Sequence, residues 1–367
     1  MEEISTYVGL DVHAETVSVC ALAAGPDGEE LFCGTIPATP EALSKLIAKL
    51  GKRGKAKFCY EAGPCGYGIQ RQIARAGHAC DVIAPSLIPV RKGERVKTDK
   101  RDSRKQARFL RAGELTAIWV PDSNHEAMRD LVRLRHQTVR ARVARQLRLS
   151  SFLLRQGRRF AKGRWTRAHW DWLRAQAFAE PAHQAVFKAL CDGLLEAGAE
   201  ERRAEKAMLA QLPKWRLAPL VEALRTLRGI DTIGAATLAS AIGDPRRFAS
   251  AASLMAYFGL VPSEHTSGPK RRQGSITRTG DGDSRRILTE AAWCHRSPPK
   301  PSLAKQALID AQPQKIREIA KTCEARLHQR TKSLIGKGKR STIIATAVAR
   351  EQAGFVWAIA REVPIIF

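Results

Sequence analysis

The first 84 residues alternate between strand-like and helix-like segments in an order that few folds accept. Three apolar or alternating runs come first, and two helical runs then separate two further strands. Strands joined by tight turns pair antiparallel, whereas strands joined through a helix pair parallel. The order therefore predicts a three-stranded meander that parallel strands extend. The expected strands are Ser5–Asp11, Thr16–Ala23, Leu31–Ile36, Ala56–Glu61 and Ala79–Ala84, and the expected helices are Pro40–Leu50 and Tyr67–Ala76.

Local signals support this order. Gly-Pro-Asp-Gly at 25–28 is a hairpin signal between the second and third strands. Leucine and isoleucine recur at helical spacing in Pro40–Leu50. The order is that of the ribonuclease-H-like fold, and a further helix at Asp102–Arg111 is expected to bring Asp102 towards the sheet.

Four carboxylates mark this part of the chain. Asp11 and Glu61 each end an apolar strand, and Asp99 and Asp102 are three residues apart. Crowded carboxylates raise one another's pKa unless a cation neutralises them. Oxygen-rich sites suit Mg²⁺, and two such ions can clamp the oxygens of a phosphodiester. The pattern predicts a metal site if the four converge, although each residue singly is also explained as a turn cap, a strand-end surface residue or a helix N-terminal acid.

The charge balance indicates a polyanionic partner. Lys and Arg total 62 against 36 Asp and Glu, which gives a net charge of +26. Residues 1–90 carry a net charge of −2, so the excess lies in the rest of the chain. DNA or RNA is the expected partner, and a solvated basic surface or a ribosomal-type structural protein is the alternative.

Residues 122–215 read as a basic helical segment. Positions 131–167 hold twelve Arg or Lys and no acid, and a long helix is expected there, paired with a second helix in Ala182–Leu212. A run of one sign repels itself unless an anion neutralises it, which favours phosphate binding over a merely soluble coiled coil. The expected apolar stripe is Leu131, Leu134, Val143, Leu147 and Leu154, and the expected phosphate ligands are Arg140, Arg142, Arg145 and Arg148.

A compact, mainly helical segment is expected from Arg216 onwards. Leu227–Ala239 resembles a helix-hairpin-helix element, in which Gly229 and Gly234 would let backbone N–H groups hold a phosphate. An ordinary αα-turn with both glycines as caps explains the pattern equally well. Helices are expected at Asp283–Trp293 and Ser341–Arg361.

Residues 257–280 are rich in Gly, Ser, Thr and basic residues, and are expected to form an exposed functional loop. Ser267 precedes three cations, Lys270, Arg271 and Arg272. A serine hydroxyl attacks phosphorus only with help from a base, a metal or cations. The residues alone do not select Ser267 among the hydroxyls of this loop.

Other features limit the location of the chain. The eight cysteines form no C-x-x-C pair, so no zinc site is expected. No basic-then-apolar leader and no run of eighteen apolar residues is found. These observations predict a cytoplasmic protein with no membrane partner.

Two blocks of motifs stand out in the sequence. They are Val8-Gly-Leu-Asp-Val-His, Tyr60-Glu-Ala-Gly, Lys97-Thr-Asp-Lys-Arg-Asp, Gly229-Ile-Asp-Thr-Ile-Gly, Tyr257-Phe-Gly-Leu-Val-Pro-Ser-Glu-His-Thr-Ser-Gly, Gly274-Ser-Ile-Thr-Arg-Thr-Gly and Arg285-Arg-Ile-Leu. In this order and spacing they resemble the DEDD-type insertion-sequence transposases, also called bridge-RNA-guided recombinases, and the resemblance covers nearly the whole chain. Small departures are Ser103, where many relatives have Ala, and Asp281 after Gly280, where relatives often carry Asn.

The resemblance implies three parts: a RuvC-like domain at 1–121, the basic helical segment at 122–215 for RNA binding and assembly, and a transposase domain at 216–367. It places a Mg²⁺-binding tetrad on Asp11, Glu61, Asp99 and Asp102, and a serine that forms a covalent link to DNA on Ser267. It further implies donor and target DNA, a structured non-coding guide RNA, a tetramer whose subunits share catalytic parts, and association with the bacterial nucleoid. The alternatives are a RuvC-like junction resolvase that uses the carboxylates alone and a non-enzymatic nucleic-acid-binding protein.

Overall fold

The computed structural model describes residues 3–25, 28–89, 98–267, 270 and 272–364. Contacts divide the chain into two compact units, Met1–Val120 and Pro121–Phe367. Part of the predicted Gly-Pro-Asp-Gly turn (Pro26 and Asp27) and the predicted cation Arg271 lie outside the described residues.

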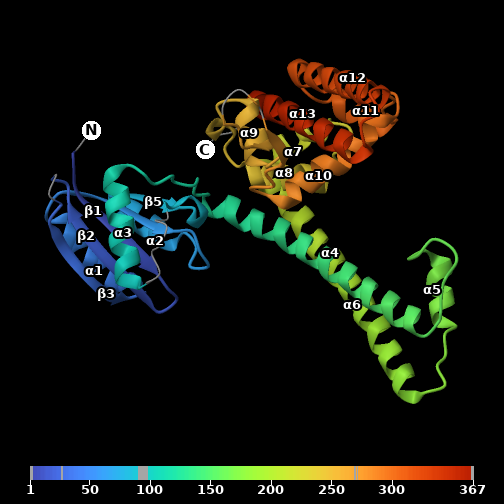
Figure 1. The fold of residues 1–367 in the computed structure, drawn as a ribbon, viewed down its shortest axis with the longest axis horizontal. Helices are drawn as coiled ribbons and strands as arrows, with labels where there is room; N and C mark the ends of the chain where they lie inside the picture. The colour runs from blue at the N-terminus through green and yellow to red at the C-terminus, as the bar shows by residue number, and fades with distance from the viewer. Residues whose placement is uncertain (1–2, 26–27, 90–97, 268–269, 271, 365–367) are drawn as a thin grey trace. The chain divides into compact units, whose positions relative to one another are not determined.

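A five-stranded sheet forms the centre of the first unit (Figure 1). Its strand order is β3-β2-β1-β4-β5, in which the first three strands pair antiparallel while β1–β4 and β4–β5 pair parallel. The predicted meander with parallel extensions is confirmed, and the chain has a mixed α/β N-terminal domain. The strands are β1 (Ile4–Val12), β2 (Thr16–Ala23), β3 (Glu30–Pro37), β4 (Lys55–Glu61) and β5 (Ala79–Ile83).

Helices cover both faces of this sheet. Helices α1 (Pro40–Gly51) and α2 (Gly68–Arg75) cover the face that carries Val8, Leu10 and Phe58, whereas α3 (Asp99–Ala112) packs on the opposite face (Figure 1). Successive residues of a strand point to opposite faces, so Asp11 lies on the side of α3. A short 3-10 helix, η1 (Pro85–Leu87), follows β5.

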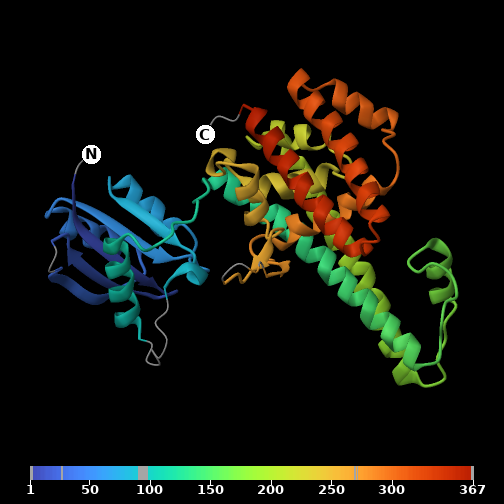
Figure 2. The same ribbon diagram turned by 45° about the horizontal axis from the view of Figure 1, so that its top comes forward.

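Two long helices begin the second unit, α4 (Ser123–Arg155) and α6 (Pro181–Gln211) (Figure 2). The short α5 (Arg167–Arg174) comes between them in the sequence. The two long helices pack side by side and antiparallel, because Arg135 of α4 contacts Glu205 of α6 while Phe152 packs with Phe187. The predicted pair of long helices is confirmed. At the end away from the helical core, Leu149, Phe152, Leu173 and neighbouring aromatic residues form a small cluster of their own.

The predicted apolar stripe on α4 is not its buried seam. Leu134, Val143, Leu147 and Leu154 are 41–62% exposed, and only Leu131 packs against the core. The buried positions of this helix are offset from that stripe, because α6 and the helical core approach α4 from another side. Those positions are His125, Met128, Val132, His136, Leu149, Phe152 and Leu153.

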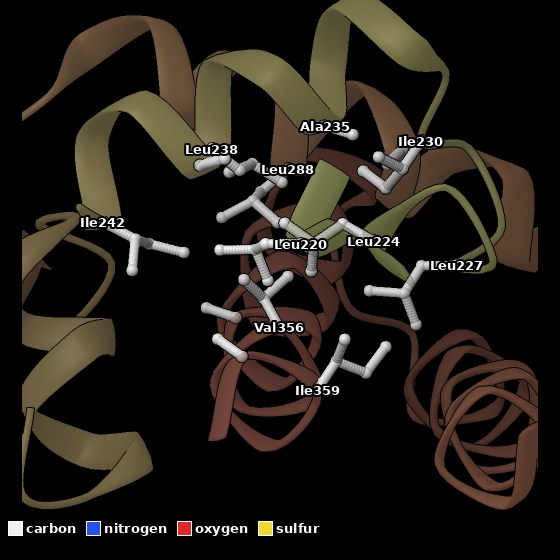
Figure 3. Close-up of a cluster of buried hydrophobic side chains, with 14 of the residues drawn as sticks. Leu220, Leu224, Leu227, Ile230, Ala235, Leu238, Ile242, Leu288, Val356 and Ile359 are labelled. Atoms are coloured by element: carbon white, nitrogen blue, oxygen red, sulfur yellow. The ribbon is translucent and has the colours of Figure 1, made fainter. Parts of the chain in front are cut away.

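The remaining helices, apart from α11, which has no buried residue, enclose one large apolar core (Figure 3). Leu224 of α7, Leu238 of α8, Leu288 of α10 and Val356 of α13 meet in it, each completely buried. The helices are α7 (Ala218–Leu224), α8 (Thr232–Ile242), α9 (Ala251–Tyr257), α10 (Gly282–Trp293), α11 (Leu303–Asp310), α12 (Gln314–Gly336) and α13 (Ser341–Glu362), with 3-10 turns η2 (Leu212–Lys214), η3 (Pro245–Arg247) and η4 (Cys294–Arg296).

Helix α13 is long and apolar enough to cross a membrane by length and composition alone. Half of its apolar stretch is buried, and it packs against α9, α10 and α12. A core helix passes the same test, so its composition is accounted for by its place in the core.

Some elements of the second unit were not expected from the sequence. The Gly- and Ser-rich stretch contains a two-stranded antiparallel ladder, β6 (Pro262–Glu264) with β7 (Gln273–Ile276). Helix α12 occupies Gln314–Gly336, where no helix was predicted. Whether 122–215 and 216–367 are separate domains within the second unit stays a prediction.

Candidate active site

The sheet brings Asp11 and Glu61 to the same edge. Leu10 of β1 pairs in parallel with Tyr60 of β4, and each carboxylate follows directly after one of these two residues. Both side chains therefore emerge at the carboxyl ends of neighbouring parallel strands, on the face covered by α3.

A glycine lets α3 lie close to this face. A Cβ atom on Gly9 would be 2.1 Å from the carbonyl oxygen of Ser103 and 2.6 Å from the amide nitrogen of Ala107. On the next strand, the Cys59 thiol donates to the carbonyl of Gln106 at 3.6 Å. The backbone of α3 thus rests directly on β1 and β4.

The first turn of α3 carries the other two carboxylates. Thr98 caps the helix by accepting a hydrogen bond from the amide of Arg101, so the helix begins at Asp99, three residues before the predicted start. Asp99 and Asp102 share one helix face because they are three residues apart. The Asp99 side chain is 62% exposed, whereas Asp102 is half-buried.

The tightest cluster includes a histidine that the sequence analysis did not single out. His13 Nε2 lies 3.4 Å from Asp11 Oδ2 and 3.8 Å from Asp99 Oδ1. One ligand atom from each of these three residues lies within 4.8 Å of the other two. The sequence signal was present, since His13 follows Asp11 by two residues in the first motif of the family resemblance.

Glu61 is held separately at the edge of this cluster. The side-chain amide of Gln106, which is buried, donates to Glu61 Oε1 at 3.3 Å. Glu61 is not one of the three residues in the tight cluster within the described part of the chain. Gln106 was also missed by the sequence analysis, and no motif in the sequence pointed to it.

The negative charge of Asp102 acts on the pKa of Asp11. Burial raises the pKa of Asp11 above its usual value, His13 lowers it, and the negative charges of Asp102 and Asp99 raise it further. Repulsion among these carboxylates is the condition that a bound cation relieves.

The donor set fits a divalent metal ion. Two carboxylates and an imidazole nitrogen come within reach of one ion, and hard divalent ions prefer such carboxylate oxygens. Asp11, Asp99 and His13 would hold the ion, with Asp102 and Glu61 beside them.

Ser267 lies in the second unit at the exposed end of the β6–β7 hairpin. It forms an isolated antiparallel bridge with Lys270 beyond the ladder. Thr266 donates to Glu264 Oε1 at 2.9 Å and accepts from the amide of Arg272 at 3.3 Å. Ser267, Lys270 and Arg272 are all exposed, so the hairpin presents a hydroxyl among cations.

The base of the hairpin is firmly anchored. Arg285 donates to the carbonyl oxygens of Phe258 and Thr279 at 2.8 and 2.7 Å. Gly259 and Gly280 have φ values of 65° and 67°, and a Cβ atom at either would collide with backbone. Both positions require glycine, which explains their place in the motifs.

Acidic residues of other helices balance part of the positive charge of the basic helix α4. Arg142 pairs with Glu201 of α6, and Arg140 pairs with Asp283 of α10. Acids distant in sequence therefore neutralise part of this helix, and phosphate binding by Arg140 and Arg142 stays a prediction. Arg145 and Arg148 are exposed and remain predicted phosphate ligands.

The predicted helix-hairpin-helix glycines make close packing contacts. A Cβ atom on Gly229 would lie 2.7 Å from Ala291 Cα of α10. The Gly234 amide donates to the capping side chain of Asp231 at 2.7 Å. The carbonyls of the turn are held from inside by Lys305, which donates to Leu227 and Ile230. Both glycines therefore pack closely against α10, and Gly234 also donates to the N-cap of α8. Phosphate binding at either glycine stays a prediction.

Comparisons with known proteins agree over most of the chain. Residues 8–156 match a family profile described as "Transposase", of the DEDD type, and residues 221–306 match the profile "Transposase IS116/IS110/IS902 family". A Sinorhizobium fredii protein named "Putative transposase y4qE" is 42% identical over 97% of this chain and 88% of its own length. The Leptospira borgpetersenii "Transposase for insertion sequence element IS1533" is 30% identical over 91% of this chain and 98% of its own length.

Proposed function

Because the chain belongs to the IS116/IS110/IS902 family of insertion-sequence transposases, enzymes that act on DNA, we propose that it cuts and rejoins DNA with two sets of residues. One is the metal-binding carboxylate set Asp11, Glu61, Asp99 and Asp102. The other is the serine nucleophile Ser267. The observation that carries the proposal is the convergence of Asp11, Asp99 and His13 at the end of the sheet, where the pKa of Asp11 also responds to Asp102.

Each group in this set has a distinct part. Transposase domains of the DEDD type use divalent metal ions, and we assign Mg²⁺ here because the carboxylates are hard oxygen ligands. Such an ion supplies Lewis-acid stabilisation of charge on a phosphodiester. Gln106 orients Glu61 through the hydrogen bond at 3.3 Å. Gly9 admits the backbone of α3 and so sets the position of Asp102.

Ser267 acts on phosphorus from the end of the hairpin. Its oxygen bonds to the phosphorus as the bond to one sugar oxygen breaks; the serine gives up its proton, and the departing sugar oxygen gains one. Lys270 and Arg272, exposed on the same hairpin, stabilise the charge that develops on the phosphoryl oxygens. The product is a phosphoserine link to DNA.

The partners follow from the same assignment. Arg145 and Arg148 on the exposed side of α4 bind nucleic-acid phosphate, which suits a structured guide RNA as well as donor and target DNA. A tetramer in which subunits share the carboxylate and serine sets, and action in the cytoplasm at the nucleoid, complete the proposal.

One gel experiment tests both sets of residues. The full chain is incubated with Mg²⁺, a DNA substrate and the RNA encoded beside its gene, and the products are run on a denaturing gel with and without protease. A protease-sensitive adduct is expected in the wild type and is lost in Ser267→Ala. Asp102→Asn is expected to abolish cleavage while RNA affinity persists. Cleavage without any adduct would instead favour a RuvC-like hydrolytic nuclease.

A further inference from the structure

A cavity of about 670 Å³ opens beside the candidate active site. Val12, Val17, Leu43 and Ile69 line it, and these side chains belong to the apolar layer under α1 and α2. The cavity therefore lies at the end of the sheet, on the face opposite α3. Its volume is in the range of small-molecule binding sites.

His13 joins this cavity to the carboxylates. It is a lining residue of the cavity, and its Nε2 atom is also 3.4 Å from Asp11 and 3.8 Å from Asp99. A nucleic-acid strand with one phosphate at the carboxylates would pass His13 before its neighbouring nucleotide reaches the cavity.

Two polar side chains in the wall make hydrogen bonds to the protein itself. The Gln72 amide nitrogen donates to the carbonyl of Pro40 at 2.7 Å and to Ser44 Oγ at 2.9 Å. The Thr39 hydroxyl accepts from the amide of Ala42 at 3.2 Å as the cap of α1. Most of the lining residues are apolar, so the cavity is suited to hold a group chiefly by its shape and by apolar contact.

We propose that this cavity receives one unpaired nucleobase from the DNA strand whose phosphate lies at the carboxylates, an inference that rests on the proposed function. A nucleobase is planar and has apolar faces, and a base that has left its stack can be held between apolar side chains. A base in a duplex enters only after leaving its stack and its pair. The site therefore selects unpaired DNA beside the cleaved bond and leaves sequence selection to other parts of the complex.

Cys65 supplies a reporter at this site. It lines the cavity and is exposed, and Cys294 is an exposed thiol in the other unit. The probe is a short single-stranded DNA of mixed sequence with one cytosine that carries a tethered aryl disulfide. The Cys65 thiol attacks the tether sulfur, forms the new S–S bond and releases the aryl thiol, which takes up the thiol proton. Peptide mass spectrometry of the full chain in Mg²⁺ then counts label at each cysteine.

Labelling of Cys65 is expected to be about tenfold faster with the single strand than with the same strand in a duplex, because the paired base must first be extruded. Labelling of Cys294 should not distinguish the two DNAs. Cys65→Ser removes the fast label and identifies its position.

Two tryptophan variants on α2 test the cavity itself. Ile69→Trp fills it and should abolish fast labelling by DNA, while a small thiol reagent still modifies Cys65. Ala74→Trp, at an exposed position of the same helix, is the matched control and should label like the wild type. If Ile69→Trp does not fold, the comparison of single strand with duplex in the wild type decides alone.

Equal labelling of Cys65 by both DNAs, or no advantage of Cys65 over Cys294, overturns the proposal. The same preparations are assayed for Asp102-dependent cleavage. Cleavage without selective labelling of Cys65 defeats the nucleobase site alone. Selective labelling without cleavage defeats the proposed function and leaves the cavity as a site for unpaired bases.

Discussion

Without metal, Asp11→Asn should be more stable than wild type. With metal present, it should be less stable than wild type. Burial and the charges of Asp102 and Asp99 raise the pKa of Asp11 in the folded chain. A carboxyl whose folded pKa lies above its unfolded value binds more protons when folded, so its ionised form at neutral pH opposes folding. Asparagine has a similar shape and removes that charge.

The expected gain follows from the spacing in the cluster. The ligand oxygens of Asp11 and Asp99 lie within 4.8 Å of each other. Coulomb's law gives a repulsion of about 1 kcal/mol at the dielectric of water and about 3.5 kcal/mol at an effective dielectric of 20. The lower figure applies because the Asp99 side chain is 62% exposed. A gain of about 1 kcal/mol raises the melting temperature of a unit of this size by roughly 4 °C.

Bound metal should make wild type more stable than Asp11→Asn. At a concentration of about 100 times its dissociation constant, a ligand adds about 2.7 kcal/mol to stability, or roughly 10 °C on the same scale. Wild type should gain this increment with Mg²⁺, and Asp11→Asn should gain little of it.

Calorimetry of the full chain, with and without Mg²⁺, measures both effects on the transition that responds to the metal. Glu41→Gln, which removes an exposed carboxylate from α1, is the control and should follow the wild type. If Asp11→Asn melts below wild type without metal, or gains as much from Mg²⁺, the carboxylate-cluster argument is refuted.

Three other predictions test separate parts of the structure. Gly9→Ala should lower the free energy of unfolding in urea by about 3 kcal/mol, because its Cβ meets the backbone of α3. Gly25→Ala, whose Cβ would have nothing within 4 Å, should lower it little. Equal losses would contradict the inference that Gly9 is needed for the close approach of α3. Burial lowers the pKa of His295 to about 4, so the free energy of unfolding should keep its full value above the unfolded pKa of about 6.5 and fall by up to about 3 kcal/mol as pH drops towards 4. In His295→Phe, the free energy of unfolding should depend less on pH over this range, and an unchanged dependence would contradict the prediction. Arg145→Ala with Arg148→Ala should lower the slope of log affinity against log salt by about 0.9 for each lost phosphate contact on duplex DNA, while Arg174→Ala, whose side chain pairs with Asp171, should leave it unchanged; a slope that stays constant in all variants argues against phosphate binding on α4.

Strand periodicity and turn signals were sufficient to predict the strands of the sheet. Each of the five strands lies within two residues of its predicted bounds, and the predicted extension of the meander by parallel strands is confirmed. These features are local, since alternation and helix-joined parallel strands constrain neighbours in the sequence. The four carboxylates were recognisable for the same reason, as residues that end strands or open a helix.

The basic segment shows where local reasoning was insufficient. A helical wheel identifies an apolar stripe but not the direction from which partners approach, and Leu147 of the predicted stripe is 62% exposed. The acids that neutralise Arg140 and Arg142 are 143 and 59 residues away in sequence. Such pairings depend on the packing of α4 against α6 and α10, which no short window of sequence contains.

The sequence by itself determined the order of strands and helices along the N-terminal part of the chain, the ends of the strands that carry carboxylates, the positive charge and the motifs of the transposase family. Tertiary structure decided which residues meet: it placed His13 between Asp11 and Asp99, and set Gln106 against Glu61. The physical reason is range. Secondary-structure periodicity and turn preference act between neighbours along the chain, whereas the contacts of a site form only after a helix packs on a sheet and brings together residues separated by tens of positions.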